Sequence, residues 1–232
     1  MRWVENEGVR WLEADLPGAR AAFSTRSAGS AKENLAPLAS ALGLPLDRIA
    51  TAHQVHGANL AAPQPFRCCL SPNNGENQQR NGILEADGHV VREPGGAAAV
   101  FVADCLPVAV AGPGGAAILH CGWRGMAAGI VARGADAVGA THAAIGPGIG
   151  PCCYEVGDEV LGAFAPLGEG IASGRMLDLA EVARRLLRDA GVVQIESFGF
   201  CTSCEEESFF SHRRDGGPGR QAGLVLIDEA GS

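Results

Sequence analysis

Aromatic residues make up only 5% of this chain, with a single Tyr, and acidic residues outnumber basic ones. A surface that stacks single-stranded nucleic acid needs aromatic rings, and one that binds phosphate backbones needs a broad basic face. A net charge of −8 therefore argues against nucleic acid as a partner.

The sequence also lacks a long hydrophobic run. Its Ala- and Gly-rich stretches are interrupted by Asp, Arg or Pro, so none reaches the roughly 20 apolar residues that span a membrane. Residues 1–18 carry acidic side chains where an export signal needs an apolar core. We therefore predict a cytoplasmic protein that does not bind membranes.

Glycine, proline and cysteine are abundant instead. The 33 Gly and 13 Pro imply many tight turns, and eight Cys are many for a cytoplasmic chain. Disulfides are not expected there, so metal binding and plain burial are the competing interpretations. Cys201-Thr-Ser-Cys204 has the spacing of a zinc knuckle or redox motif, but the lack of a second pair at ribbon spacing disfavours a structural knuckle. The adjacent pairs Cys68–Cys69 and Cys152–Cys153 are not expected to form a disulfide framework.

Three metal-binding side chains stand at the ends of apolar, strand-like runs: His56 in QVHG, Cys105 after AAAVFVAD, and His120 after AAIL. Strand ends place side chains on a shared rim with little backbone freedom, which suits a metal site. One thiolate and two imidazoles fit Zn²⁺, and three protein ligands leave a fourth position open, as in catalytic zinc sites. These residues are therefore a candidate zinc site, with buried core residues as the alternative.

Strand and helix patterns alternate irregularly along the chain. Near-continuous apolar runs after residue 84 are typical of strands covered on both faces. There are too few crossover helices for a doubly wound sheet, so we predict an α+β fold, a layered sandwich forming a single domain over residues 1–232, with an irregular polar loop at 63–82. The expected helices are 33–42, 124–139 and 178–190, the last with a capping box at Asp178 and Glu181. The expected strands are 18–26, 49–55, 59–62, 84–91, 97–112, 116–123, 141–145, 192–196 and 223–228.

The chain resembles the polyphenol-oxidase (laccase-domain) family, also described as peptidoglycan editing factor and as purine nucleoside phosphorylase. The motifs that carry the resemblance are STR at 24–26, QVHG at 54–57, EAD at 85–87, ADCLPV at 103–108, HCGWRG at 120–125, IGPGIGPCCYEVGDEV at 145–160 and CTSCEEESFFSHRRDGGPGRQAGLVLI at 201–227. The resemblance implies an α/β/β/α sandwich. It also implies that the ligands of zinc, with copper possible, are His56, Cys105 and His120.

Three features depart from the family pattern. The loop after STRSAGS, which usually carries an SLN element before the helix near Asn34, is largely missing, so part of the substrate rim is expected to be absent. The polar segment Pro63–Gly82 replaces a shorter connection. HCGWRG stands where the family usually has HAGWRG, which puts the thiol of Cys121 beside a ligand.

Charged residues near these motifs are candidates for catalysis. Arg124, at an expected helix start, and Arg26, at a strand end, are placed to contact an anion. Asp104 would orient a ligand or a ribose, or cap a turn. A metal-bound His needs an outer acceptor, which Asp87 or Asp104 would supply. His53 is expected in the outer shell or on the surface. Tyr154 and Glu155 would line the pocket or begin a helix, and the structural role is favoured.

The predicted substrate-binding residues include Arg213 and Arg214 of FFSHRRD, whose planar guanidinium groups carry paired donors suited to phosphate or carboxylate. One of these two arginines is also placed to pair with Asp215. The full predicted set is Arg213, Arg214, Asp87 and Ser24.

The favoured function is phosphorolysis of a purine nucleoside (adenosine, inosine or methylthioadenosine), with nucleoside and phosphate as small-molecule partners, in a monomer or weak homodimer. Adenosine deamination and hydrolytic editing of cell-wall precursors are alternatives that the resemblance implies. Copper-dependent phenol oxidation is disfavoured because six His cannot supply both a blue-copper centre and a three-copper cluster. A non-enzymatic domain, with zinc closed by Cys121, is the remaining alternative.

Overall fold

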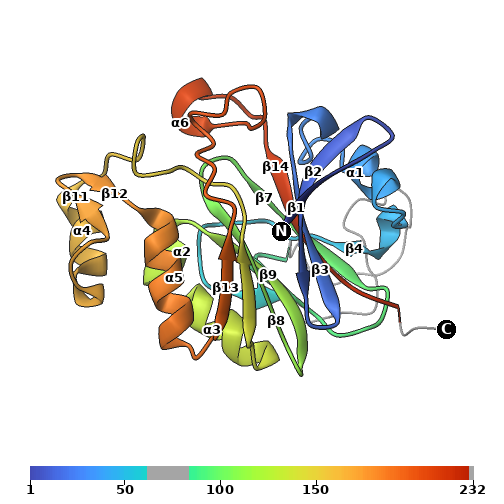
Figure 1. Cartoon of the computed structure of the whole chain (residues 1–232), viewed down its shortest axis with the longest axis horizontal. Helices are drawn as coiled ribbons and strands as arrows, with labels where there is room; N and C mark the ends of the chain where they lie inside the picture. Colours follow the sequence, from blue (N-terminus) through green and yellow to red (C-terminus); the bar gives the residue numbers. More distant parts are fainter. Residues whose placement is uncertain (62–83, 230–232) are drawn as a thin grey trace.

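The structure is a computed structural model that describes residues 1–61 and 84–229, so the loop expected at 63–82 lies outside the described residues. The described strands form two six-stranded sheets and a two-stranded ribbon (Figure 1). The first sheet, in spatial order, consists of β1 (Arg2–Asn6), β2 (Val9–Leu16), β3 (Ala19–Ser24), β14 (Gln221–Ile227), β7 (Ala97–Val102) and β4 (Ile49–Ala50).

The second sheet carries most of the segments that lead into the site. Its order is β13 (Gln194–Ser197), β10 (His142–Ile145), β8 (Leu106–Gly112), β9 (Gly115–Cys121), β6 (Gly88–Val91) and β5 (Leu60–Ala61). The ribbon pairs β11 (Ala172–Ser173) with β12 (Met176–Leu177). Both sheets are mixed, although most of their pairings are antiparallel.

Helices cover the outer faces of the two sheets (Figure 1). The α-helices are α1 (Ala36–Ala41), α2 (Trp123–Ala127), α3 (Ile130–Val138), α4 (Asp158–Phe164), α5 (Leu179–Asp189) and α6 (His212–Asp215). Short 3₁₀ turns are η1 (Arg26–Ala28), η2 (Leu46–Arg48) and η3 (Ala165–Leu167). Among the described residues, no helix has the length and apolar character needed to cross a membrane.

Three apolar clusters show how the layers pack. Leu38 of α1 lies against the outer face of the first sheet. Phe23 and Val225 of the first sheet meet Ile118 and other residues of the second sheet in the middle layer. The helices α3 and α5 cover the far face of the second sheet. The order α1, sheet, sheet, then α3 and α5 confirms the predicted α+β layered α/β/β/α sandwich.

Strand β8 shows how the sequence produces this layering. Val108 and Val110 point toward the helices, whereas Ala109 and Ala111 point toward the other sheet. Side chains alternate between the two faces of a strand, so a near-continuous apolar strand can be buried on both sides. Small residues on the inner face allow the sheets to pack closely.

The helix expected over 124–139 is two helices, so that prediction was wrong. α2 ends at Ala127 and α3 begins at Ile130, with Gly129 between them in the left-handed region at φ 89°. Glycine adopts this conformation without a steric penalty, so the chain turns sharply where periodicity alone suggested continuity.

Other boundaries also differ. The run 97–112 is divided between β7 and β8, which belong to different sheets, and residues 103–105 make the crossing. Within the expected strand 49–55, only Ile49–Ala50 is a strand. β1 and β2, which were not predicted from the sequence, form an antiparallel pair at the edge of the first sheet.

The N-terminal cap of α5 is confirmed. The Asp178 carboxylate accepts a hydrogen bond from the Glu181 N–H at 2.9 Å. The return bond of a full capping box is replaced, because the Asp178 N–H donates to the Ile171 carbonyl and the Glu181 carboxylate pairs with Arg184 and Arg185. The Asp178 side chain therefore caps one N–H group of α5, and the ion pairs of Glu181 with Arg184 and Arg185 stabilise the helix further along.

Candidate functional site

The buried carboxylate of Asp87 organises the region around QVHG. Its two oxygens accept hydrogen bonds from the N–H groups of Val55, His56 and Gly57, at 3.2, 2.9 and 2.7 Å. His56 has a left-handed backbone, at φ 59°, which turns these three N–H groups toward one anion. Asp87 itself is fully buried. The sharp turn of QVHG is thus stabilised by a charge that belongs to another segment.

Asp87 also fixes the orientation of the His120 ring. Its Oδ1 lies 2.8 Å from Nδ1 of His120, which leaves Nε2 of that ring directed elsewhere. Metal-binding histidines commonly use their second nitrogen in this way. One carboxylate therefore positions both histidines of the predicted metal site.

The ligand atoms of His56, Cys105 and His120 lie within 4.8 Å of one another. The two imidazole rings meet edge to face, with centroids 4.7 Å apart. His120 comes from β9, Cys105 lies in the crossing just before β8, and His56 lies in the turn held by Asp87. The structure thus forms a possible His/Cys metal site from these three residues.

The electrostatics of the trio favour an ionised thiol. Burial opposes ionisation of Cys105, but hydrogen bonds with His120 and His56 lower its pKa to about 6. Burial likewise opposes a charged His120, yet its bonds to Asp87 and Cys105 raise its pKa to about 9. A thiolate is the form in which cysteine binds metal, so the donor set fits a thiophilic divalent ion.

Two glycines of the HCGWRG motif leave room for this arrangement. A Cβ on Gly122 would lie 2.9 Å from Sγ of Cys105 and 3.3 Å from the His56 ring. A Cβ on Gly125 would lie 2.7 Å from the Gly57 carbonyl oxygen. The separations of 2.9 and 2.7 Å are too short for a side chain, so this motif needs glycine where its backbone passes close to the ligands.

Asp104, immediately before the thiol, is a second organising carboxylate. Its backbone is in the left-handed region at φ 88°, which is unusual for a residue other than glycine. Its oxygens accept from the Thr202 hydroxyl and the Arg213 N–H, each at 2.7 Å. Asp104 therefore connects the crossing that carries Cys105 to the C-terminal FFSHRRD segment.

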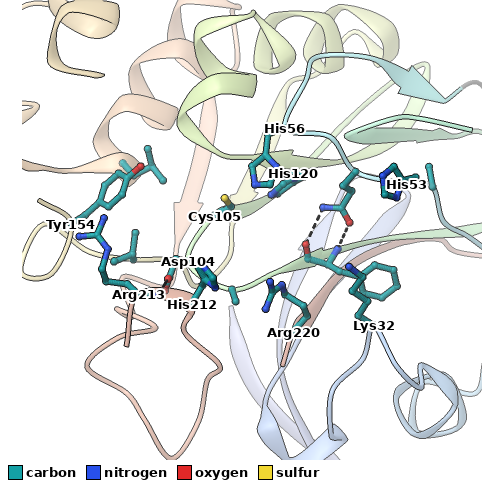
Figure 2. Close-up of a pocket in the computed structure, with 16 residues that line it drawn as sticks. Lys32, His53, His56, Asp104, Cys105, His120, Tyr154, His212, Arg213 and Arg220 are labelled. Carbon is teal, nitrogen blue, oxygen red and sulfur yellow. Dashed lines mark hydrogen bonds between the residues drawn. The ribbon is translucent and has the colours of Figure 1, made fainter. Parts of the chain in front are cut away.

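The three ligand residues open onto a cavity of about 520 Å³. This volume is in the range of small-molecule binding sites. Figure 2 shows the thiol and the two rings on one wall, with Arg213 beside Tyr154 and Arg220 facing the ligands from another segment. The other basic or aromatic lining residues are Lys32, His53, Phe101 and His212.

Several of these lining residues were missed or assigned differently from the sequence. Tyr154 lines the cavity, with the Arg213 guanidinium 5.4 Å from its ring centroid, so it takes the pocket-lining alternative rather than the favoured structural role alone. His53, expected in the outer shell or on the surface, also lines it. Arg220 follows the FFSHRRD motif closely, so the sequence could have indicated it as a site residue. No motif or pattern in the sequence singled out Lys32.

The predicted substrate-binding residues take different positions. Only Arg213 lines the cavity. Arg214 binds Asp215 and the carbonyls of Thr202, Ser203 and Phe209. Ser24 is buried in the first sheet, where its Oγ accepts from the Ala222 N–H. Asp87 lies behind His120 rather than at the cavity surface, which matches the outer-acceptor role considered for it.

The catalytic candidates Arg26 and Arg124 also lie outside the cavity lining. Arg26 pairs with Asp215 at 2.7 Å and covers the ring of Phe210. The Arg124 guanidinium lies over the neighbouring ring of Trp123, at 4.4 Å from its centroid. Asp104 does line the cavity. A catalytic role for any of the three stays a prediction.

Cys121 is separate from the candidate metal site, contrary to the alternative of a fourth thiol ligand. It is fully buried among apolar residues on the helix side of the second sheet. His120 and Cys121 are consecutive in β9, and consecutive side chains point to opposite faces of a strand. Among the described His, Cys, Asp and Glu residues, the trio groups with no fourth ligand.

Comparisons with known proteins agree with this architecture. "Purine nucleoside phosphorylase YlmD" of Geobacillus stearothermophilus is 32% identical over an alignment of 257 positions, covering 92% of each chain. A protein named purine nucleoside phosphorylase from Deinococcus radiodurans is 38% identical, covering 80% of this chain and 72% of its own. The crystal structure of the Geobacillus YlmD matches with a TM-score of 0.77 at 30% identity, covering 98% of this chain and 99% of that one.

A crystal structure of a Neisseria meningitidis protein matches with a TM-score of 0.74 at 29% identity, covering 94% of this chain and 99% of that one. The model of one family, described as multi-copper polyphenol oxidoreductase laccase, matches residues 23–228. This match begins in β3 and ends just after β14, so it includes the whole trio, every residue that lines the cavity and the whole second sheet, but not β1 and β2 of the first sheet. On this evidence the chain belongs to the multi-copper polyphenol oxidoreductase laccase family.

Proposed function

We propose that this protein is a zinc-dependent purine nucleoside phosphorylase, acting on adenosine, inosine or methylthioadenosine. The observation that carries the proposal is the cavity in which a His/Cys/His trio faces several basic side chains and two aromatic rings. The names of the relatives point to the same class of reaction. Two imidazoles and one thiolate are a donor set that zinc accepts, with a coordination position left for substrate.

The basic side chains of the cavity would hold phosphate. Arg213 and Arg220 come from the C-terminal segment, and Lys32 comes from the segment after η1. Guanidinium groups bind phosphate oxygens through paired N–H donors. The rings of Phe101 and Tyr154 offer apolar faces for the purine.

In phosphorolysis, the bond from the anomeric carbon to the base nitrogen breaks while a phosphate oxygen bonds to the same carbon. The transition state resembles an oxocarbenium ion, so holding the phosphate dianion close to that carbon lowers the barrier. Bound zinc would supply Lewis-acid stabilisation of negative charge. Asp104 would act as a positioning residue, since its carboxylate holds the Arg213 N–H and the Thr202 hydroxyl.

Phenol oxidation fits less well, although it appears in the family's description. All six histidines lie within the described residues, and only His56 and His120 group with other potential ligands. His89 is buried within β6, away from that group. A blue-copper oxidase needs a three-copper cluster in addition to its His₂Cys centre, which these residues do not furnish.

The test is to incubate the purified protein with inosine, adenosine and methylthioadenosine, with and without phosphate, and to separate the products by chromatography. We expect free base and sugar 1-phosphate, formed only when phosphate is present. Conversion of adenosine to inosine without base release would indicate a deaminase instead. Base release independent of phosphate, or no base release by zinc-loaded protein, would contradict the proposal.

Two variants and one control sharpen this test. His120→Ala should abolish turnover, and Arg220→Gln should raise the KM for phosphate with less effect on kcat. Arg133→Gln is a matched control, because Arg133 lies exposed on α3 and does not line the cavity. Equal phosphate dependence in Arg220→Gln and Arg133→Gln would remove Arg220 from the phosphate site.

A further inference from the structure

Four cysteine thiols converge at a place separate from the His/Cys/His trio. Cys152 and Cys153 lie in the turn after β10, and Cys201 and Cys204 lie in the turn after β13. Their sulfur atoms are all within 4.8 Å of one another. No second cysteine pair follows Cys201 and Cys204 at the spacing of a zinc ribbon in the sequence. In the folded chain, Cys152 and Cys153 lie where such a pair would be.

The sulfur separations match a metal-centred tetrahedron. Sγ of Cys204 lies 3.4 Å from Sγ of Cys152 and 3.5 Å from Sγ of Cys153. Four thiolates at about 2.3 Å from a central zinc ion stand about 3.8 Å apart. A disulfide needs about 2.05 Å, and four mutually close sulfurs single out no one pair for bonding.

The backbone around the thiols resembles a metal-binding turn. Cys201 and Cys204 enclose a tight turn in which the N–H groups of Cys204 and Glu205 both donate to the Cys201 carbonyl. The Gly150 N–H donates to Sγ of Cys201 at 3.2 Å. Such N–H donors to ligand sulfurs orient thiolates and offset part of their charge.

We propose that Cys152, Cys153, Cys201 and Cys204 form a second metal site, which binds one zinc ion through four thiolates. Because four protein ligands close the coordination sphere, this site is structural rather than catalytic. Tetrahedral sulfur ligation selects zinc among the common divalent ions, or alternatively iron. It joins two turns about 50 residues apart in sequence.

The joined turns support residues that line the cavity. The Cys153 carbonyl accepts a hydrogen bond from the Arg213 guanidinium, and Tyr154 follows Cys153 directly. Thr202, within the second turn, donates to Asp104. Gly148 and Cys201 form a parallel bridge that connects the two segments. A metal held here would therefore brace the residues that face the trio.

The experiment measures metal content in the full chain. Protein from cells supplied with zinc is analysed by elemental analysis and native mass spectrometry. We expect about two zinc ions per chain. His120→Ala should lose the ion of the His/Cys/His trio, and the double variant Cys152→Ser/Cys204→Ser should lose the ion of the four-cysteine site. Ser203→Ala is the matched control in the same turn, and it should retain both.

A second measurement covers the case in which the cysteine variant does not fold. His120→Ala keeps all four thiols, so after zinc removal and addition of Co²⁺ it should show the intense visible absorption of tetrathiolate cobalt. Absence of that spectrum in folded protein would overturn the proposal. Iron in place of zinc would overturn the metal assignment. A native mass lower by the hydrogens of one or two disulfides would overturn the site.

Discussion

At the scale of single residues, Asp87 contacts both the QVHG turn and the His120 ring of the site. Burial alone would raise its pKa, but its bonds with His120 and with the N–H groups of Gly57 and Val55 lower the pKa overall. The carboxylate is therefore an anion that holds the QVHG turn and the His120 ring together. Its motif, EAD, was visible in the sequence, whereas the four hydrogen-bond partners of its carboxylate were not.

Asp87→Asn should weaken zinc binding at the His/Cys/His site. An amide lacks the charge and one of the acceptors that hold His56 and His120, and loss of such an outer partner typically costs about 10- to 100-fold in metal affinity. Activity regained on titrating metal-depleted protein with zinc measures this affinity. Asp136→Asn, an exposed change on α3, is the control. Equal zinc requirements in the two variants would refute the role assigned to Asp87.

At the scale of elements, β6 illustrates how a strand that is covered on both faces constrains the side chains it carries. All four of its residues are buried, yet one of them is His89. Its Nε2 has no hydrogen-bond partner within residues 1–61 and 84–229, and burial lowers its pKa to about 4. The strand therefore accepts this ring only in its neutral form.

This burial gives a pH dependence with a definite sign. In the unfolded chain the pKa of His89 is 6.5, so below this pH the unfolded chain binds a proton that His89 in the folded chain does not bind. The stability of the fold therefore falls as the pH drops from 6.5 to about 4. Across that window the loss attributable to His89 reaches about 3 kcal/mol. Urea unfolding at about pH 7.5 and about pH 4.5 measures it.

His89→Leu should reduce the acid-induced loss of stability by that amount. His142→Leu, on the half-buried first position of β10, should behave like the parent chain and serves as the control. If the parent chain and His89→Leu lose equal stability on acidification, His89 is not the group that titrates.

The elements also differ in how clearly their local sequences predict them. The helix at 179–189 was predictable because Asp178, Glu181 and Gly191 mark its ends locally. The break at Gly129 was not, because a glycine in a helical pattern can continue a helix or turn it. β1 and β2 escaped notice since their polar edge positions obscure the alternation.

At the scale of the whole molecule, the two sheets pack closely where β14 faces β8. A Cβ on Gly223 would lie 2.3 Å from Cβ of Pro107, on the other sheet. No side chain fits there unless the sheets separate. The glycine in the last strand is therefore a requirement of the sandwich rather than of the strand.

Gly223→Ala should destabilise the fold by about 1–3 kcal/mol through overpacking between the sheets. Gly162→Ala in α4 is the matched control, since its Cβ would meet no atom within 4 Å and alanine favours the helix. Urea unfolding of both variants measures the difference. Equal stability of the two would show that the sheets adjust freely at this point.

From the sequence alone follow the residue types of the metal trio, the apolar runs that become buried strands, the local signals of α5 and, through its motifs, the family. These depend on short-range chemistry: side-chain donors, periodicity and capping. The folded chain was needed to show that Arg213, Arg220 and Lys32 share the cavity, that Ser24, Arg26 and Arg124 lie outside it, and that four thiols lie close together. Such contacts arise where the two sheets and the crossings between them bring distant segments together. The spacing of residues along the chain does not specify the distance between them in the fold.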